Sequence, residues 1–150
     1  MRENFMYVGS SYLVLKREGT VLLQRRKNTG YMDGHYGLPS GHLEGGETAR
    51  EGGSREFKEE IGVEIAPMDL VMVHVMHRKG SKDSDERIDF FMTTEHFEGE
   101  VRNMEPEKCD DLSWFPLIDL PPNTIPYIRQ ALEEIRVGSP YSEFGWHSPS

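Results

Sequence analysis

The sequence predicts an α/β (α+β) fold in which a mixed β-sheet lies between helices. Three observations support this prediction: strand-like segments near the start of the chain, a central helix with clear start and stop signals, and further strands that precede a final helix. The chain has 150 residues, which matches the usual size of one domain, so we expect residues 1–150 to form a single domain.

The first elements are two strands. Residues 6–16 and 20–26 have strand-like composition, and the short segment 17–19 between them reads as a hairpin turn that ends in glycine. A loop rich in Gly and Asn follows at residues 28–37. The chain therefore begins with a hairpin and then turns toward a glycine-rich segment.

The central helix is marked at both ends. Thr48 followed by Glu51 forms a capping-box pattern, and Gly62 is well placed as the helix stop. A glycine inside a helix costs about 1 kcal/mol relative to alanine, so Gly53 is unexpected. It precedes Phe57 by one turn, and we hypothesise that the missing side chain makes room for the ring.

The second half of the chain predicts three more strands, at residues 69–78, 88–95 and 112–116. Residues 125–137 form the last predicted helix, with Ile128, Leu132 and Ile135 on one side. Residues 138–150 show no clear period and are expected to be an irregular tail.

Composition limits the possible partners. A net charge of −9 and a pI near 5.1 argue against binding duplex nucleic acid, because the phosphate backbone requires a basic surface. Cys109 is the one cysteine, so no intramolecular disulfide can form. No long apolar stretch predicts a membrane partner, and the expected compartment is the reducing cytoplasm.

Three carboxylates converge on one face of the central helix. Glu56 and Glu60 are one turn apart, and Glu59 lies beside them. Like charges at this spacing repel one another unless a cation lies among them. Oxygen ligands favour a hard ion, so the pattern predicts Mg²⁺, with Mn²⁺ as a possible substitute.

These carboxylates belong to a longer pattern over residues 41–63. Its fixed positions are Gly41, Glu47, Arg55, Glu56, Glu59, Glu60 and Gly62. The pattern resembles the Nudix box, the signature of the Nudix hydrolase family, with Phe57 as a departure where a smaller aliphatic residue is usual. The resemblance implies an α/β/α sandwich and hydrolysis of a nucleoside diphosphate linked to another group.

The same resemblance implies roles for the residues of the box. Glu56, Glu59 and Glu60 would be metal ligands, together with the backbone carbonyl of Ser40. Gly41 and Glu47 would organise the loop before the helix, and Arg55 would hold a glutamate or contact a phosphate. Which carboxylate deprotonates the attacking water is left open.

Residues 97–114 resemble a stretch of the MutT-like branch, which converts nucleoside triphosphates to monophosphates and pyrophosphate. In that comparison Glu105 is a further metal ligand or base, and Glu107 is the next candidate. MutT-like enzymes present an asparagine to the base from the loop before the last helix, and Asn123 is the candidate for this role. If the flanking prolines of the two loops are aligned, however, Thr124 takes the place of that asparagine. The leading prediction is therefore hydrolysis of a nucleoside triphosphate, ordinary or oxidised.

Other candidate substrate contacts are Arg25 and Arg26, which end a strand, and His35 and Tyr36 in the loop before the box. Two alternatives stay open: a nucleotide-sugar or dinucleotide pyrophosphohydrolase, and a nucleotide-binding regulator without catalysis. The expected partner is a small nucleoside phosphate, bound by a monomer or a homodimer.

Overall fold

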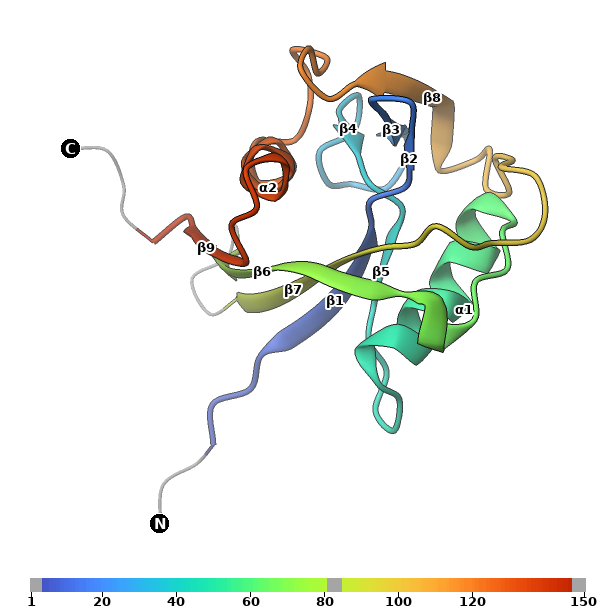
Figure 1. Cartoon of the computed structure of the whole chain (residues 1–150). Coiled ribbons are helices and arrows are strands. Elements are labelled where there is room, and N and C mark those ends of the chain that lie inside the picture. The colour runs from blue at the N-terminus through green and yellow to red at the C-terminus, as the bar shows by residue number, and fades with distance from the viewer. Residues whose placement is uncertain (1–3, 81–84, 147–150) are drawn as a thin grey trace.

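The fold is shown by a computed structural model that describes residues 4–80 and 85–146 (Figure 1). Within these residues it contains helix α1 (Ala49–Ile61), the short 3-10 helix η1 (Pro67–Asp69), helix α2 (Pro126–Arg136) and nine strands. The strands are β1 (Val8–Leu13), β2 (Lys16–Arg17), β3 (Thr20–Arg26), β4 (Tyr36–Gly37), β5 (Ser40–His42), β6 (Val71–Lys79), β7 (Glu86–Thr93), β8 (Cys109–Pro116) and β9 (Tyr141–Phe144).

The strands form two sheets. The larger has the order β5-β1-β7-β6-β9, in which β1 pairs with β7 in parallel and β6 pairs with β9 in parallel. The other neighbours in this sheet are antiparallel, so the sheet is mixed. The smaller sheet joins β2, β3 and β4, and β8 also pairs with β3. The predicted mixed α/β class is confirmed.

The two helices cover opposite faces of the larger sheet. Successive residues of a strand point to opposite faces, and the adjacent residues Tyr12 and Leu13 of β1 belong to different core clusters. Tyr12 packs in the cluster that contains Ile128 of α2, and Leu13 packs in the cluster that contains Phe57 of α1. Figure 1 shows α1 and α2 on the two sides of β1, β7 and β6. This arrangement is a sheet between helices.

Helix α1 begins and ends where its sequence predicts. The Thr48 hydroxyl accepts a hydrogen bond from the Glu51 N–H at 3.1 Å, and the Glu51 carboxylate accepts one from the Thr48 N–H at 3.0 Å. Gly62 ends the helix with φ of 74°, a conformation that costs a glycine little. The two caps therefore fix the limits of α1, the helix that carries the three carboxylates.

The packing around α1 also explains why a glycine stands at position 53. A Cβ at Gly53 would lie 2.9 Å from Cε of Met92 and 3.1 Å from the ring of Phe57. Both neighbours are fully buried. The geometry supports the hypothesis that Gly53 makes room for the aromatic ring.

The prediction of an irregular C-terminal tail is wrong for its middle part. Residues 141–144 form β9 against the edge of β6, and the Trp146 indole N–H donates to the carbonyl of His77 at 2.9 Å. A four-residue edge strand is too short to show a period in the sequence, and the free edge of β6 selects its conformation. Residues 147–150 of the predicted tail lie outside the described residues.

The two histidines of β6 have different surroundings. His74 is buried, with one ring nitrogen 2.7 Å from the Ser139 carbonyl and the other 2.7 Å from the Ser142 hydroxyl. His77 packs against Tyr7 and Trp146.

In the described part of the chain no helix is both long and apolar enough to cross a membrane.

Candidate functional site

The carboxylates of α1 line a cavity of about 430 Å³, and side chains from three other segments line it as well. Its acidic wall is made by Glu56, Glu59 and Glu60 of α1 and by Glu105 from the loop before β8. Its basic lining is Arg25, Arg26 and Lys108. Negative and positive side chains therefore share one opening, as hydrolysis of a metal-bound phosphate ester requires. We call this opening the carboxylate cavity.

The loop before α1 packs tightly against the helix. A Cβ at Gly41 would overlap the carboxyl group of Glu56, so only glycine lets this part of the loop approach the carboxylate. The Glu47 carboxylate accepts hydrogen bonds from Arg55 Nη2 at 2.8 Å, from Arg55 Nε at 3.3 Å and from the Glu44 N–H at 2.7 Å. Arg55 thus ties the loop to the helix.

Arg55 also orients Glu56. Its Nη1 donates to Glu56 Oε1 at 2.7 Å and lies 3.9 Å from Glu59 Oε1. Burial raises the pKa of Glu56, and the Arg55 guanidinium opposes that rise. The arginine holds one carboxylate of the cavity in place and lowers the cost of its charge.

Glu60 lies deepest among the four carboxylates. It accepts hydrogen bonds from the Ser40 N–H at 3.1 Å and from Gln24 Nε2 at 3.1 Å. Burial nevertheless raises the pKa of Glu60 to about 8, and the nearby charges of Glu105 and Glu56 push in the same direction. An anionic Glu60 is therefore unfavourable unless a cation compensates its charge.

The donor set fits a hard divalent ion. It consists of carboxylate oxygens and the Ser40 backbone beside Gly41, and His42 and Cys109 also line the cavity. The side chains as they stand do not surround one point: among residues 4–80 and 85–146 no group of three acidic, histidine or cysteine side chains has metal-site geometry. Two of the carboxylates instead accept hydrogen bonds from protein donors, Glu56 from Arg55 and Glu60 from Gln24.

The loop before β8 contributes Glu105. The side-chain oxygen of Asn103 accepts the Glu105 N–H at 3.1 Å, and the Glu105 carbonyl accepts the N–H groups of Lys108 and Cys109. These bonds turn the loop toward α1, so that Glu105 lines the cavity. Glu107, the second candidate, is exposed and is not among the residues that line this cavity.

Arg25 and Arg26 both line the carboxylate cavity. Arg25 is already paired with Asp110, with Nε 2.6 Å from the carboxylate. Arg26 donates through Nε to the carbonyl of Tyr31 at 2.7 Å, and its guanidinium lies over the Tyr31 ring. Among the described residues no ion pair joins Arg26 to a carboxylate, so Arg26 is better placed than Arg25 to meet a phosphate.

A second cavity of about 400 Å³ adjoins the first, and we call it the arginine cavity. The two cavities share Arg26, Ser40, Gly41 and His42. The second is otherwise lined by Ser10, Tyr12, Gly30, Tyr31, Arg78, Asp85, Arg87 and Tyr127. The shared residues make one continuous binding region with an acidic part and an aromatic, arginine-rich part.

Three predicted substrate residues do not line either of these two cavities. His35 is half-buried and its ring contacts the carbonyl of Asp33. Tyr36 is buried and donates its hydroxyl to Asp111 at 2.5 Å. Asn123 donates to the Gly34 carbonyl at 2.8 Å and so braces the loop.

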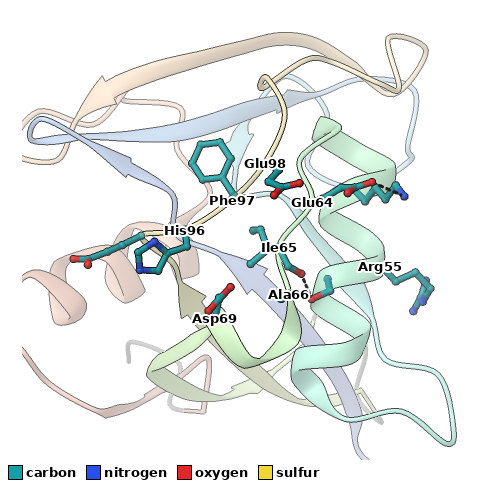
Figure 2. Close-up of a pocket in the computed structure, with 11 residues that line it drawn as sticks. Arg55, Glu64, Ile65, Ala66, Asp69, His96, Phe97 and Glu98 are labelled. Atoms are coloured by element: carbon teal, nitrogen blue, oxygen red, sulfur yellow. Dashed lines mark hydrogen bonds and ion pairs between the residues drawn. The ribbon is translucent and has the colours of Figure 1, made fainter.

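A third cavity, of about 740 Å³, lies away from this region (Figure 2). Glu64, Ile65, His96, Phe97 and Glu98 line it from the segments that follow α1 and β7, as Figure 2 shows. It receives none of Glu56, Glu60 or Glu105. Its greater volume does not make it the chemical site, because the converging carboxylates are elsewhere.

Several lining residues of the carboxylate cavity were not predicted, among them Gln24, His42 and Lys108. Gln24 alternates with Arg26 on β3, and this spacing of two was the available signal. His42 and Lys108 lie in a short strand and in a loop, and no period in the sequence distinguishes them.

Comparisons with known proteins agree with the fold. A family model described as the NUDIX domain matches residues 7–135. The solved structure of a MutT NUDIX hydrolase from Burkholderia pseudomallei is 27% identical, with a TM-score of 0.77 over 85% of this chain and 97% of that chain.

Two further solved structures are similar in fold. The MutT protein from Methanosarcina mazei Go1 is 23% identical, with a TM-score of 0.73 over 87% of this chain and 94% of that chain. A structure described as ADP compounds hydrolase is 21% identical, with a TM-score of 0.69 over 88% of this chain and 72% of that chain. Because the family model covers most of the sequence, the chain belongs to the Nudix family and is a hydrolase that acts on nucleoside diphosphate-linked substrates.

Proposed function

We propose that this Nudix hydrolase uses Mg²⁺ to convert a nucleoside triphosphate to a monophosphate and pyrophosphate. The observation that carries the proposal is the carboxylate cavity, in which Glu56, Glu59, Glu60 and Glu105 meet and Arg26 and Lys108 supply positive charge. The adjoining arginine cavity has the size and aromatic lining that suit a nucleoside. A substrate with phosphates at one end and a base at the other fits both.

The residues that would hold the metal are Glu56, Glu59, Glu60 and the carbonyl of Ser40. Mg²⁺, when bound, would neutralise phosphate charge and acidify a bound water. Arg55 keeps Glu56 oriented through its 2.7 Å hydrogen bond, and Arg26 stands between the two cavities to orient the phosphate chain. In this proposal the reacting phosphorus would lie opposite the acidic wall.

Hydrolysis then requires a proton acceptor. The oxygen of water forms a bond to phosphorus, the anhydride P–O bond breaks, and the water proton passes to a carboxylate. Glu59 and Glu105 are the candidates, because both line the cavity without the close hydrogen bonds that hold Glu56 and Glu60. Lys108, whose Nζ is 3.9 Å from Glu105, could stabilise the charge of the departing phosphate.

The test is pyrophosphate release from a panel of ordinary and oxidised nucleoside triphosphates with Mg²⁺. Nucleotide sugars, dinucleoside polyphosphates and ADP-ribose belong in the same panel. We expect turnover of one or more triphosphates, and a loss of at least about a hundredfold in kcat in Glu60→Gln. Glu64→Gln is the matched control, because Glu64 pairs with Lys58 outside the carboxylate cavity.

Thermal unfolding separates metal binding from turnover. Mg²⁺ at a hundred times its Kd should stabilise the protein by about 2.7 kcal/mol, and Glu60→Gln should abolish most of this gain. Turnover of a nucleotide sugar or dinucleotide alone would replace the triphosphate by the alternative substrate class. Tight Mg²⁺ binding with no turnover across the panel would favour the regulator and overturn the proposal.

A further inference from the structure

The inner wall of the arginine cavity contains a buried hydroxyl without a partner. Ser10 is 2% exposed, and its Oγ makes no hydrogen bond to any of the described residues. Ser10 lies on β1 between His42 of β5 and Asp89 of β7 in the strand register, and it lines the cavity. Burying a hydroxyl without a partner is unfavourable, so a ligand group that reaches the wall and pairs with it would offset that cost.

Arg78 lines the same wall, and hydrogen bonds to buried groups hold its guanidinium in place. Its Nε donates to Asp89 at 2.7 Å, and Nη2 contacts the other oxygen of Asp89 and the Tyr12 hydroxyl, each at 3.4 Å. The guanidinium also lies 3.7 Å from the centre of the Tyr127 ring. Within the described residues Nη1 donates no hydrogen bond, so the arginine keeps donor capacity for a ligand.

The carboxylate that fixes Arg78 is hidden from the ligand. Asp89 is 0% exposed and does not line the cavity, whereas Arg78 does. Asp85 lies on the cavity lining but is bound to Arg87, with oxygen–nitrogen distances of 3.1 and 3.2 Å. The Tyr12 and Tyr127 hydroxyls are 3.2 Å apart and share a hydrogen bond. The wall therefore presents an arginine that can only donate, beside an unpaired hydroxyl that can donate or accept.

We propose that Ser10 and Arg78 make the enzyme select nucleobases that present an oxo group over those that present an amino group at the same position. The inference rests on the proposed function, because it assigns the base to the arginine cavity. Guanine and thymine offer an oxygen acceptor at the position where adenine and cytosine carry an amino donor. An amino group facing the Arg78 guanidinium would set donor against donor and leave buried hydrogen-bonding groups unpaired, whereas an oxo group can accept from both Arg78 and Ser10.

The test uses substrate pairs that differ by one group. Inosine triphosphate and ATP differ in an oxo against an amino group on the purine, and UTP and CTP differ in the same way on the pyrimidine. We expect kcat/KM to favour the oxo member of each pair by about tenfold or more. In Ser10→Ala the ratio should fall by about fivefold through a higher KM for the oxo member, with kcat little changed.

Ser11→Ala is the matched control. Ser11 is a neighbouring buried serine on β1, but it faces α1 and its hydroxyl donates to the Ala49 carbonyl at 2.8 Å. This variant should keep the wild-type ratios. Equal effects of the two substitutions on the ratio, or ratios near one in the wild type, would overturn the inference while leaving the hydrolase intact.

Binding of the product monophosphates separates this inference from the proposed reaction. Calorimetry with inosine monophosphate and AMP, and with UMP and CMP, measures base preference without hydrolysis. A preference for the oxo members that Ser10→Ala weakens would support the inference even if no triphosphate were hydrolysed. Equal binding within both pairs would contradict it.

Discussion

At the scale of single residues, hydrogen bonds decide which polar side chains face a ligand. Tyr36 and Asn123 are residue types that often bind bases, yet their polar atoms are occupied by Asp111 and by the Gly34 carbonyl. The paired residues are 75 and 89 positions apart in the sequence. A local pattern cannot reveal such partners, and so the sequence could not show that Tyr36 and Asn123 do not line the two cavities.

The Tyr36–Asp111 bond predicts a pH dependence of stability. The tyrosine hydroxyl lowers the pKa of Asp111 below its ordinary value of 3.8, so the bond stabilises the fold above that pH, and the stabilisation is lost as the pH falls through the lowered pKa. We expect Tyr36→Phe to reduce the free energy of unfolding by about 1.5–3 kcal/mol at pH 7. The deficit should shrink below about pH 4.

Urea unfolding of wild type and Tyr36→Phe between pH 7 and pH 3 measures this difference. Tyr31→Phe is the control, because Tyr31 is 37% exposed and should change stability little at any pH. A deficit of constant size across the whole range would show that the hydroxyl does not act through the charged form of Asp111.

At the scale of elements, α1 was the most predictable part of the chain. Its start at Thr48 and its stop at Gly62 depend on hydrogen bonds between residues within one turn, which the sequence displays directly. The position of Glu56 and Glu60 on one face follows from the helical period. The reason for Gly53 is only partly local, because Met92 approaches it from β7.

Filling the space at Gly53 should destabilise the helix packing. In Gly53→Leu the new side chain would meet Met92 and Phe57, and we expect a loss of about 1–3 kcal/mol in the free energy of unfolding. In Gly53→Ala the gain of about 1 kcal/mol in helix propensity is offset by the crowding of the Cβ against Met92 and Phe57, so this variant should be close to neutral. Thermal or urea unfolding checks both variants, and equal stability of Gly53→Leu and wild type would refute the packing explanation.

At the scale of the whole molecule, the C-terminal segment completes the larger sheet. The Ser142 hydroxyl lies 2.7 Å from His74 Nε2, and the Ser139 carbonyl lies 2.7 Å from His74 Nδ1. The histidine is 1% exposed, so these two contacts satisfy a buried polar ring. Strand β9 is thus attached to the sheet by side-chain bonds as well as by its parallel pairing with β6.

Removal of the Ser142 hydroxyl should destabilise the protein. We expect Ser142→Ala to lower the free energy of unfolding by about 1–3 kcal/mol, because one ring nitrogen of His74 loses its partner. Ser139→Ala is the matched control: it keeps the carbonyl that His74 contacts and changes only a hydroxyl on an exposed contact. Equal stability of the two variants, measured by chemical unfolding, would show that the Ser142 contact contributes nothing.

The sequence by itself determined the family, the mixed α/β class, the limits of α1 and the approach of Glu56, Glu59 and Glu60. These features depend on hydrogen bonds and spacings within a few residues. The tertiary structure decided which other groups meet them: Gln24 and Glu105 from distant segments, the pairing of β9 with β6, and the wall formed by Ser10 and Arg78. Those contacts arise because sheet pairing brings distant segments together, and no local period in a sequence records that pairing.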